Sequence, residues 1–145
     1  MFVLNDTELA AELLRMTDLY TDELFASDHL SLIYPVSRLV CDVERFRDDG
    51  RERMSEIGMG AIYTRTSQGT VLRHITADEK AQILRAYYDV HHAKLEAFCA
   101  SMPSRPCLII DAHSFPGTPL PYEQDQDPHR PDFCIGTDSF HTPSE

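Results

Sequence analysis

The chain has 145 residues, of which 42% are hydrophobic and 26% are charged, and its formal net charge is -11. This length and composition fit one globular domain with a hydrophobic core. The negative charge argues against nonspecific binding of nucleic acid, which requires clustered basic side chains. No apolar run is long enough to span a bilayer, and the start of the chain has no secretory signal, so we expect no membrane partner.

The four cysteines are widely spaced and form no C-x-x-C pair; they are Cys41, Cys99, Cys107 and Cys134. We interpret them as reduced thiols of a cytoplasmic protein rather than as a disulfide framework or a zinc knuckle. A cysteine hydrolase is a weak alternative, because no cysteine has a recognisable nucleophile setting. Glycine-rich phosphate loops, H-E-x-x-H and G-x-S-x-G are also missing from the sequence.

A helix is predicted from about Thr7, with Asn5 or Asp6 as its cap. Its apolar face is expected to consist of Leu9, Leu13, Met16, Tyr20 and Leu24. Three acidic residues lie near its predicted C-terminal end, namely Asp18, Asp22 and Glu23. Acidic groups there oppose the helix dipole, which indicates either a functional use or, more commonly, a solvated acidic face.

The alternation of apolar and polar residues in the segment 32–45 predicts a strand that ends near its last few residues. Arg38, Asp42 and Arg45 then cluster at or near the strand ends. Two arginines here are suited to an acidic substrate, because a guanidinium group binds a carboxylate through paired hydrogen bonds. The alternative is that both arginines pair with neighbouring acidic side chains on the surface, where such pairs contribute little stability.

A long helix is predicted from Thr76 to about Cys99. Thr76 and Glu79 have the spacing of a capping box, which marks its start. His91 and His92 are adjacent and therefore cannot point in the same direction from a helix. A histidine on an otherwise apolar helix face is more often a core residue than a functional one.

The segment 107–115 is a short apolar run that leads into Asp111 and His113. Its length and its flanking prolines favour a buried strand over a helix. Ligands of α/β proteins bind just beyond the carboxyl ends of such strands, and strand residues two positions apart share a face. His113 is therefore a candidate metal ligand or catalytic base with Asp111 to orient its ring. A buried histidine bonded to a capping aspartate is the alternative.

Predicted helices and strands alternate along the chain, and a further short strand is expected at 132–136. This order predicts an α/β fold of three layers, α/β/α, with a mixed, mostly parallel sheet in a single domain over residues 1–145. The first predicted element is a helix and the last is a strand. We therefore expect an incomplete sheet, as in a fragment or a shortened member of a larger unit.

The ordered set of motifs resembles the N-formylglutamate amidohydrolase family. Ser37–Arg45 is similar to the family pattern S-R-x-x-x-D-x-N-R, although Glu44 stands where the family more often has asparagine. Tyr88–Leu95, Asp111–Ser114 and Pro131–Gly136 follow in the family order. An early Pro-His-Ser-Gly segment and a later part with a glutamate base do not occur in the sequence, which agrees with a chain that is shortened at both ends.

The resemblance implies a Zn²⁺-dependent amidohydrolase that is related in fold to zinc carboxypeptidases and aspartoacylase. His113 would be one zinc ligand, and Glu23 would be another, with Asp22 as the fallback. Asp111 would orient His113, and His92 would lie close to the site. Zinc would activate water and polarise the amide carbonyl, while a carboxylate transfers a proton to the leaving amine.

The resemblance further implies that Arg38 and Arg45 hold the carboxylates of a small acidic acyl-amino acid, such as the N-formylglutamate of histidine degradation. Two alternatives remain open. In the first alternative, the substrate is another acyl-amino acid or a peptide end, because an arginine pair indicates an acid but not which acid. Otherwise the chain is a truncated or degenerate family member without catalysis that acts as a binding module.

Overall fold

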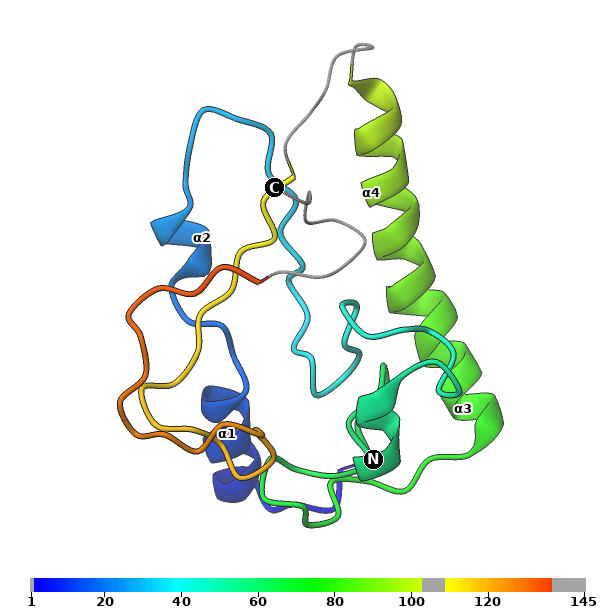
Figure 1. Ribbon diagram of the computed structural model, residues 1–145. Helices are drawn as coiled ribbons and strands as arrows, with labels where there is room; N and C mark the ends of the chain where they lie inside the picture. Colours follow the sequence, from blue (N-terminus) through cyan, green and yellow to red (C-terminus); the bar gives the residue numbers. More distant parts are fainter. Residues whose placement is uncertain (1, 103–108, 137–145) are drawn as a thin grey trace.

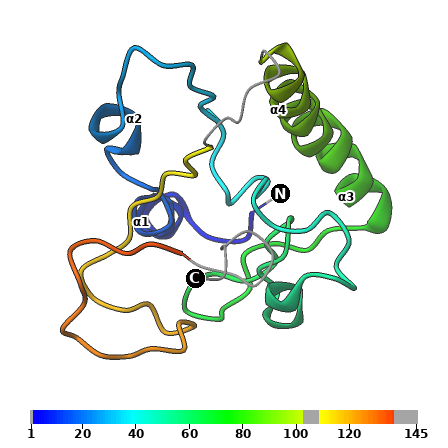
Figure 2. The same ribbon diagram turned by 45° about the horizontal axis from the view of Figure 1, so that its top comes forward.

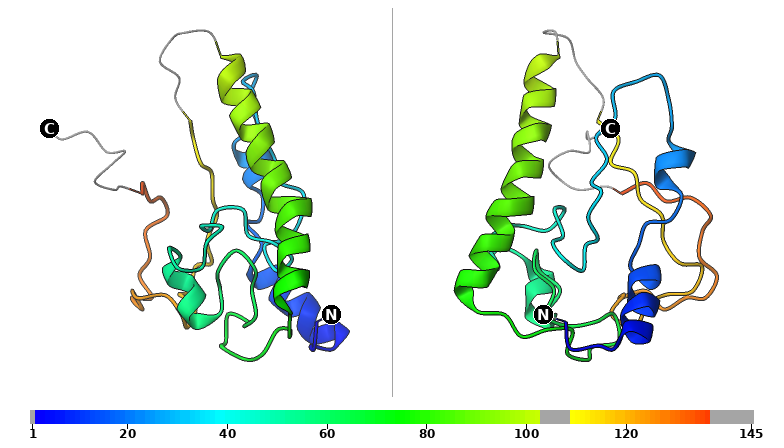
Figure 3. Two further views of the ribbon diagram at one scale, coloured as in Figure 1. Left: turned by 90° about the vertical axis from the view of Figure 1, so that its right-hand side faces the viewer. Right: turned by 180° about the vertical axis from the view of Figure 1, so that it is seen from behind.

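The computed structural model describes residues 2–102 and 109–136. Its helical elements are α1 (Asp6–Arg15), α2 (Thr21–Leu24), the 3-10 helix η1 (Arg53–Ile57), α3 (Ala77–Ile83), the π-helical turn η2 (Leu84–Tyr88) and α4 (Asp89–Ser101). The last three form one continuous rod along one side of the molecule, and α1 and α2 lie on the other side (Figure 1). The tilted view and the view from behind show the same separation (Figures 2 and 3).

The long helix is confirmed. Thr76 caps α3 through the amide of Glu79, and the Glu79 carboxylate accepts a hydrogen bond from the Thr76 amide in return. The rod then continues to Ser101. No helix in the described part of the chain combines the length and the apolar composition that crossing a membrane requires.

The N-terminal helix is shorter than the sequence predicts. Asn5 and Glu8 form a capping box at its start, but α1 ends at Arg15. Tyr20 then adopts the left-handed conformation with φ of 64°, which a right-handed helix cannot contain. Asp18 therefore lies between two helices, after the end of α1, and helical structure resumes only with α2.

The predicted three-layer α/β/α fold with a mostly parallel sheet is wrong. Within residues 2–102 and 109–136, β-pairing is limited to isolated antiparallel bridges, namely Phe2 with Arg73, Met59 with Tyr63, and Arg65 with Val71. In the predicted strand of segment 32–45, the amides of Val40 and Cys41 donate to the carbonyl of Ser37 and bend the chain into a turn. The alternation is not kept either, because Asp42 is buried together with Leu39, Cys41 and Val43.

The other two predicted strands are extended but unpaired. Ile109 and Ile110 are 63% and 67% exposed, and Phe133 and Ile135 are both 92% exposed. A strand requires a neighbour that pairs with its N–H and C=O groups, and neither segment has such a neighbour among the described residues. The first two residues of the predicted strand 107–115 lie outside the described residues, as does the chain from 137 onward.

Two small hydrophobic clusters take the place of a core between layers. The first cluster contains Met16, Leu39, Met59, Tyr63, Leu72 and Leu120. The second cluster contains Cys41, Val43, Ala61, Ile62, Leu84 and Tyr88. Because Leu39 belongs to the first cluster and Cys41 and Val43 to the second, the loop that carries Arg38 and Glu44 is fixed between them.

Candidate metal and substrate site

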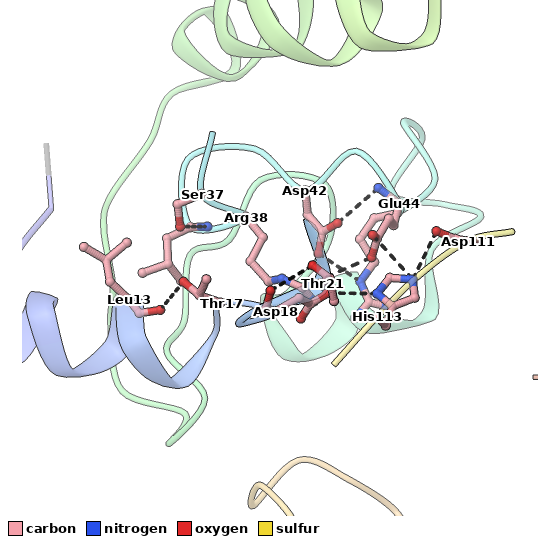
Figure 4. Close-up of polar contacts among 12 residues, drawn as sticks. Leu13, Thr17, Asp18, Thr21, Ser37, Arg38, Asp42, Glu44, Asp111 and His113 are labelled. Carbon is pink, nitrogen blue, oxygen red and sulfur yellow. Dashed lines mark hydrogen bonds and ion pairs between the residues drawn. The ribbon is translucent and has the colours of Figure 1, made fainter. Parts of the chain in front are cut away.

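Three acidic or imidazole side chains from distant parts of the chain meet at one point (Figure 4). Asp18 follows α1, Glu44 lies in the loop fixed between the two clusters, and His113 lies in the segment 109–115. One possible ligand atom of each residue lies within 4.8 Å of the corresponding atoms of the other two. This is the only such group of three found among the described residues.

Both ring nitrogens of His113 face carboxylates. Nδ1 lies 2.8 Å from Oδ2 of Asp18, and Nε2 lies 3.3 Å from Oδ1 of Asp111 and 3.5 Å from Oε1 of Glu44. Hydrogen bonds with Asp111 and Asp18, together with the charge of Glu44, raise the pKa of His113 to about 10. These contacts therefore favour the imidazolium form of His113, and the hydrogen bond with His113 lowers the pKa of Asp111.

A buried network holds Glu44 in place. Oδ1 of Asp42 accepts a hydrogen bond from the Glu44 amide at 3.1 Å, and Oδ2 accepts one from the Tyr63 hydroxyl at 2.7 Å. Asp42 and Tyr63 are 2% and 0% exposed. Burial, followed by the charge of Asp42, raises the pKa of Tyr63, so its hydroxyl remains a donor. The Glu44 backbone is thereby tied to the hydrophobic core.

The two arginines of the Ser37–Arg45 motif have different partners. Nη2 of Arg38 lies 2.7 Å from Oδ2 of Asp18 and 3.8 Å from Oε2 of Glu44. Nε of Arg45 lies 3.5 Å from Oδ2 of the buried Asp42. Arg38 therefore contacts two members of the cluster directly, whereas Arg45 supports the buried network behind the cluster.

A small pocket opens beside the cluster, with a volume of about 160 Å³. Its lining includes Asp18, Arg38 and His113, and the chain from Phe115 to Glu123 supplies a second part of the wall through Phe115, Pro116, Leu120, Tyr122 and Glu123. Leu120 anchors this wall in the first hydrophobic cluster, and burial raises the pKa of Tyr122. Arg45 is not one of the lining residues.

The residues predicted as ligands are not all brought together. Glu23 and Asp22 are exposed on α2 and do not belong to the cluster. Asp18 takes that place, because the chain leaves α1 early and turns at Tyr20. The sequence marked Asp18 as one of three acidic residues near a helix end, but only the backbone path selects it. The sequence does not indicate Glu44 as a ligand, because it suggests only a possible partner of the arginines and a departure from the asparagine of the family pattern.

His92 and Asp111 lie at different distances from the cluster. Nε2 of His92 is 2.9 Å from the carbonyl oxygen of Val43, and its ring stacks on Tyr88 with the centroids 4.3 Å apart. His92 thus supports the residue next to Glu44 and does not reach the cluster itself. Asp111 is in direct contact with His113 at the edge of the site.

The donor set of the cluster fits zinc. Zinc accepts carboxylate oxygen and imidazole nitrogen, and a catalytic site combines three protein ligands with one open position. Two ligands of a tetrahedral zinc at about 2.1 Å lie roughly 3.4 Å apart, so three atoms within 4.8 Å of one another require only small side-chain adjustments. Asp18, Glu44 and His113 are the residues that would hold the ion.

Two carboxylates and a histidine beside a small pocket form a group that could hold a metal ion next to a bound substrate. The sequence comparison identifies a family of hydrolases. Residues 3–144 match the family model of N-formylglutamate amidohydrolase, which is nearly the whole chain. The chain therefore belongs to the N-formylglutamate amidohydrolase family, as its motifs predicted. Comparisons with curated proteins and with solved structures give no match.

Proposed function

We propose that this chain hydrolyses the amide bond of an N-acyl amino acid, with N-formylglutamate as the substrate, and that Asp18, Glu44 and His113 hold a catalytic zinc ion. The observation that carries the proposal is the convergence of these three side chains beside a pocket in a member of this family. When bound, zinc supplies the Lewis acidity that polarises an amide carbonyl and activates water.

The other side chains have distinct tasks in this proposal. Asp111 contacts His113 and orients its ring. Its carboxylate is exposed and accepts a proton from the attacking water, which it returns to the leaving amine. Arg38 lines the pocket and binds a substrate carboxylate, which places the amide next to the cluster. Arg45 and His92 support the loop that carries Glu44.

The size and charge of the pocket support a small acidic substrate. Its volume of about 160 Å³ lies below the range of roughly 300–1,000 Å³ that is usual for drug-sized ligands. Arg38 supplies positive charge inside a chain whose net charge is -11. A short acyl group on one acidic amino acid meets both conditions better than a peptide does.

Formate release from N-formylglutamate tests the proposal directly. We expect turnover with zinc, loss of turnover after chelation, and recovery when zinc is added back. Replacement of His113 with alanine should abolish turnover, whereas replacement of the exposed His29 with alanine should not. Unchanged turnover in His113→Ala would exclude this mechanism. A wild-type chain that neither binds zinc nor releases formate would support the alternative of a non-catalytic binding module.

A further inference from the structure

We propose that Arg38 couples the two halves of the site: zinc binding releases Arg38 from the ligand cluster, and the released guanidinium then binds the carboxylate of the substrate. Zinc and the acid consequently strengthen each other's binding. This inference rests on the proposed function, because it takes zinc as the metal and an acidic acyl-amino acid as the substrate.

The contacts of Arg38 show which pairing zinc would weaken. Oδ2 of Asp18 faces both Nη2 of Arg38, at 2.7 Å, and Nδ1 of His113, at 2.8 Å (Figure 4). The same Arg38 nitrogen lies 3.8 Å from Oε2 of Glu44. Two of the three residues that would hold the ion are therefore paired with one arginine. An ion at the cluster attracts the same carboxylates and weakens their pairing with Arg38.

Arg38 is the cation whose pairing depends on the metal. The other arginine that lines the pocket, Arg15, pairs with Glu12 at 2.5 Å. Glu12 is 3% exposed, and it also accepts hydrogen bonds from the amide and the hydroxyl of Ser67. Since Glu12 does not belong to the cluster, zinc does not compete for the partner of Arg15.

The sign of the coupling follows from competition for Arg38. In the metal-free chain an incoming acid has to compete with Asp18 for the guanidinium. With zinc bound, Asp18 is engaged by the ion and the acid meets less competition. Linkage requires that the acid tighten zinc binding by the same factor by which zinc tightens acid binding. We expect a factor of about ten, which is within the usual range for coupled sites.

An acid whose carboxylate binds zinc directly would also bind more tightly when zinc is present. Variants are therefore needed to distinguish direct ligation from the release of Arg38. Arg38→Gln removes the coupling in our proposal but leaves direct ligation intact. Asp18→Asn removes the partner of Arg38, and glutarate should therefore bind more tightly even without zinc. Asp111→Asn removes an equal charge near the site without releasing Arg38, and it serves as the matched control for Asp18→Asn.

The experiment measures the zinc Kd of the full chain with and without saturating glutarate, a dicarboxylate that has no amide bond to hydrolyse. We expect glutarate to lower the zinc Kd about tenfold in the wild type. Arg47→Gln should show the same decrease, because Arg47 pairs with Asp89, which does not belong to the cluster. Arg38→Gln should show no change. Coupling that persists in Arg38→Gln, or zinc binding in the wild type that ignores glutarate, overturns the inference.

A second measurement does not depend on the folding of Arg38→Gln. Isothermal titration of the zinc-free chain with glutarate should give a clearly lower Kd for Asp18→Asn than for Asp111→Asn. Equal Kd values for the two variants overturn the inference. The two claims can fail separately. If formate release requires zinc but zinc and glutarate do not affect each other's binding, the proposed function holds and only this inference is overturned. A wild-type chain without zinc affinity overturns both.

Discussion

The imidazole Nδ1 of His113 lies 2.8 Å from Oδ2 of Asp18, a residue 95 positions earlier in the chain. This contact joins the turn after α1 to the extended segment 109–115. Both residues also line the pocket. A local sequence pattern cannot indicate a contact between residues so far apart in the chain. The metal site that we propose depends on this contact.

The first prediction separates the ligand selected by geometry from the ligand predicted from the sequence. Asp18→Asn keeps the shape of the side chain but removes its charge, and we expect the zinc Kd to rise by about a hundredfold or more, since even outer partners of a metal site contribute 10–100-fold. Glu23→Gln should leave the zinc Kd unchanged, because Glu23 is exposed outside the cluster. Competition with a chelating dye measures both values. The opposite ranking would restore Glu23 as the ligand.

The second prediction concerns pH and the metal-free chain. His113 has a raised pKa of about 10 in the folded state and an ordinary value of 6.5 when unfolded. The folded chain therefore binds more protons than the unfolded chain between these values, and its stability falls as pH rises. The contribution of His113 is complete below about pH 6.5 and is lost by about pH 10.

Thermal melts from pH 6 to pH 10.5 measure this contribution. The wild type should lose more Tm over this range than His113→Gln, which cannot carry the charge. Other groups titrate near pH 10, so the difference between the two proteins is the relevant quantity. Parallel Tm curves would contradict the contacts between His113 and the three carboxylates.

The third prediction compares two tyrosine hydroxyls. Tyr63→Phe leaves Oδ2 of the buried Asp42 without its 2.7 Å hydrogen bond, and we expect a loss of about 1–3 kcal/mol in the free energy of unfolding. Tyr34→Phe removes a hydroxyl whose contact is with the thiol of Cys41, a weak hydrogen-bonding group. That change should cost clearly less than Tyr63→Phe, because it leaves no buried carboxylate without its donor. Urea denaturation measures both, and equal losses would argue against the network behind Glu44.

The fourth prediction concerns the attachment of α1. Glu12 is 3% exposed, and its carboxylate accepts hydrogen bonds from Arg15 and from the amide and hydroxyl of Ser67. Glu12→Gln should cost about 1.5–3 kcal/mol of unfolding free energy, as expected for hydrogen bonds to a charged acceptor. Glu8→Gln, at the exposed capping box, should cost less than about 1 kcal/mol. Denaturant titrations that rank the two variants in reverse would contradict this account.

The family and much of the local structure can be predicted from the amino-acid sequence alone. The motifs around Arg38, His92 and His113 indicate the N-formylglutamate amidohydrolase family, and the match over residues 3–144 confirms it. The capping box at Thr76 is also correct. These features depend on nearby residues, and a linear pattern records them.

The tertiary structure alone decided the fold and the composition of the cluster. Alternating apolar residues predict burial, but pairing into a sheet requires a neighbouring strand, which the described residues do not provide. The identity of the acidic partner of His113 depends on where α1 ends and on the left-handed turn at Tyr20, so Asp18 lies in the cluster and Glu23 does not. Contacts between segments this far apart follow from the path of the whole backbone, and a local pattern does not specify that path.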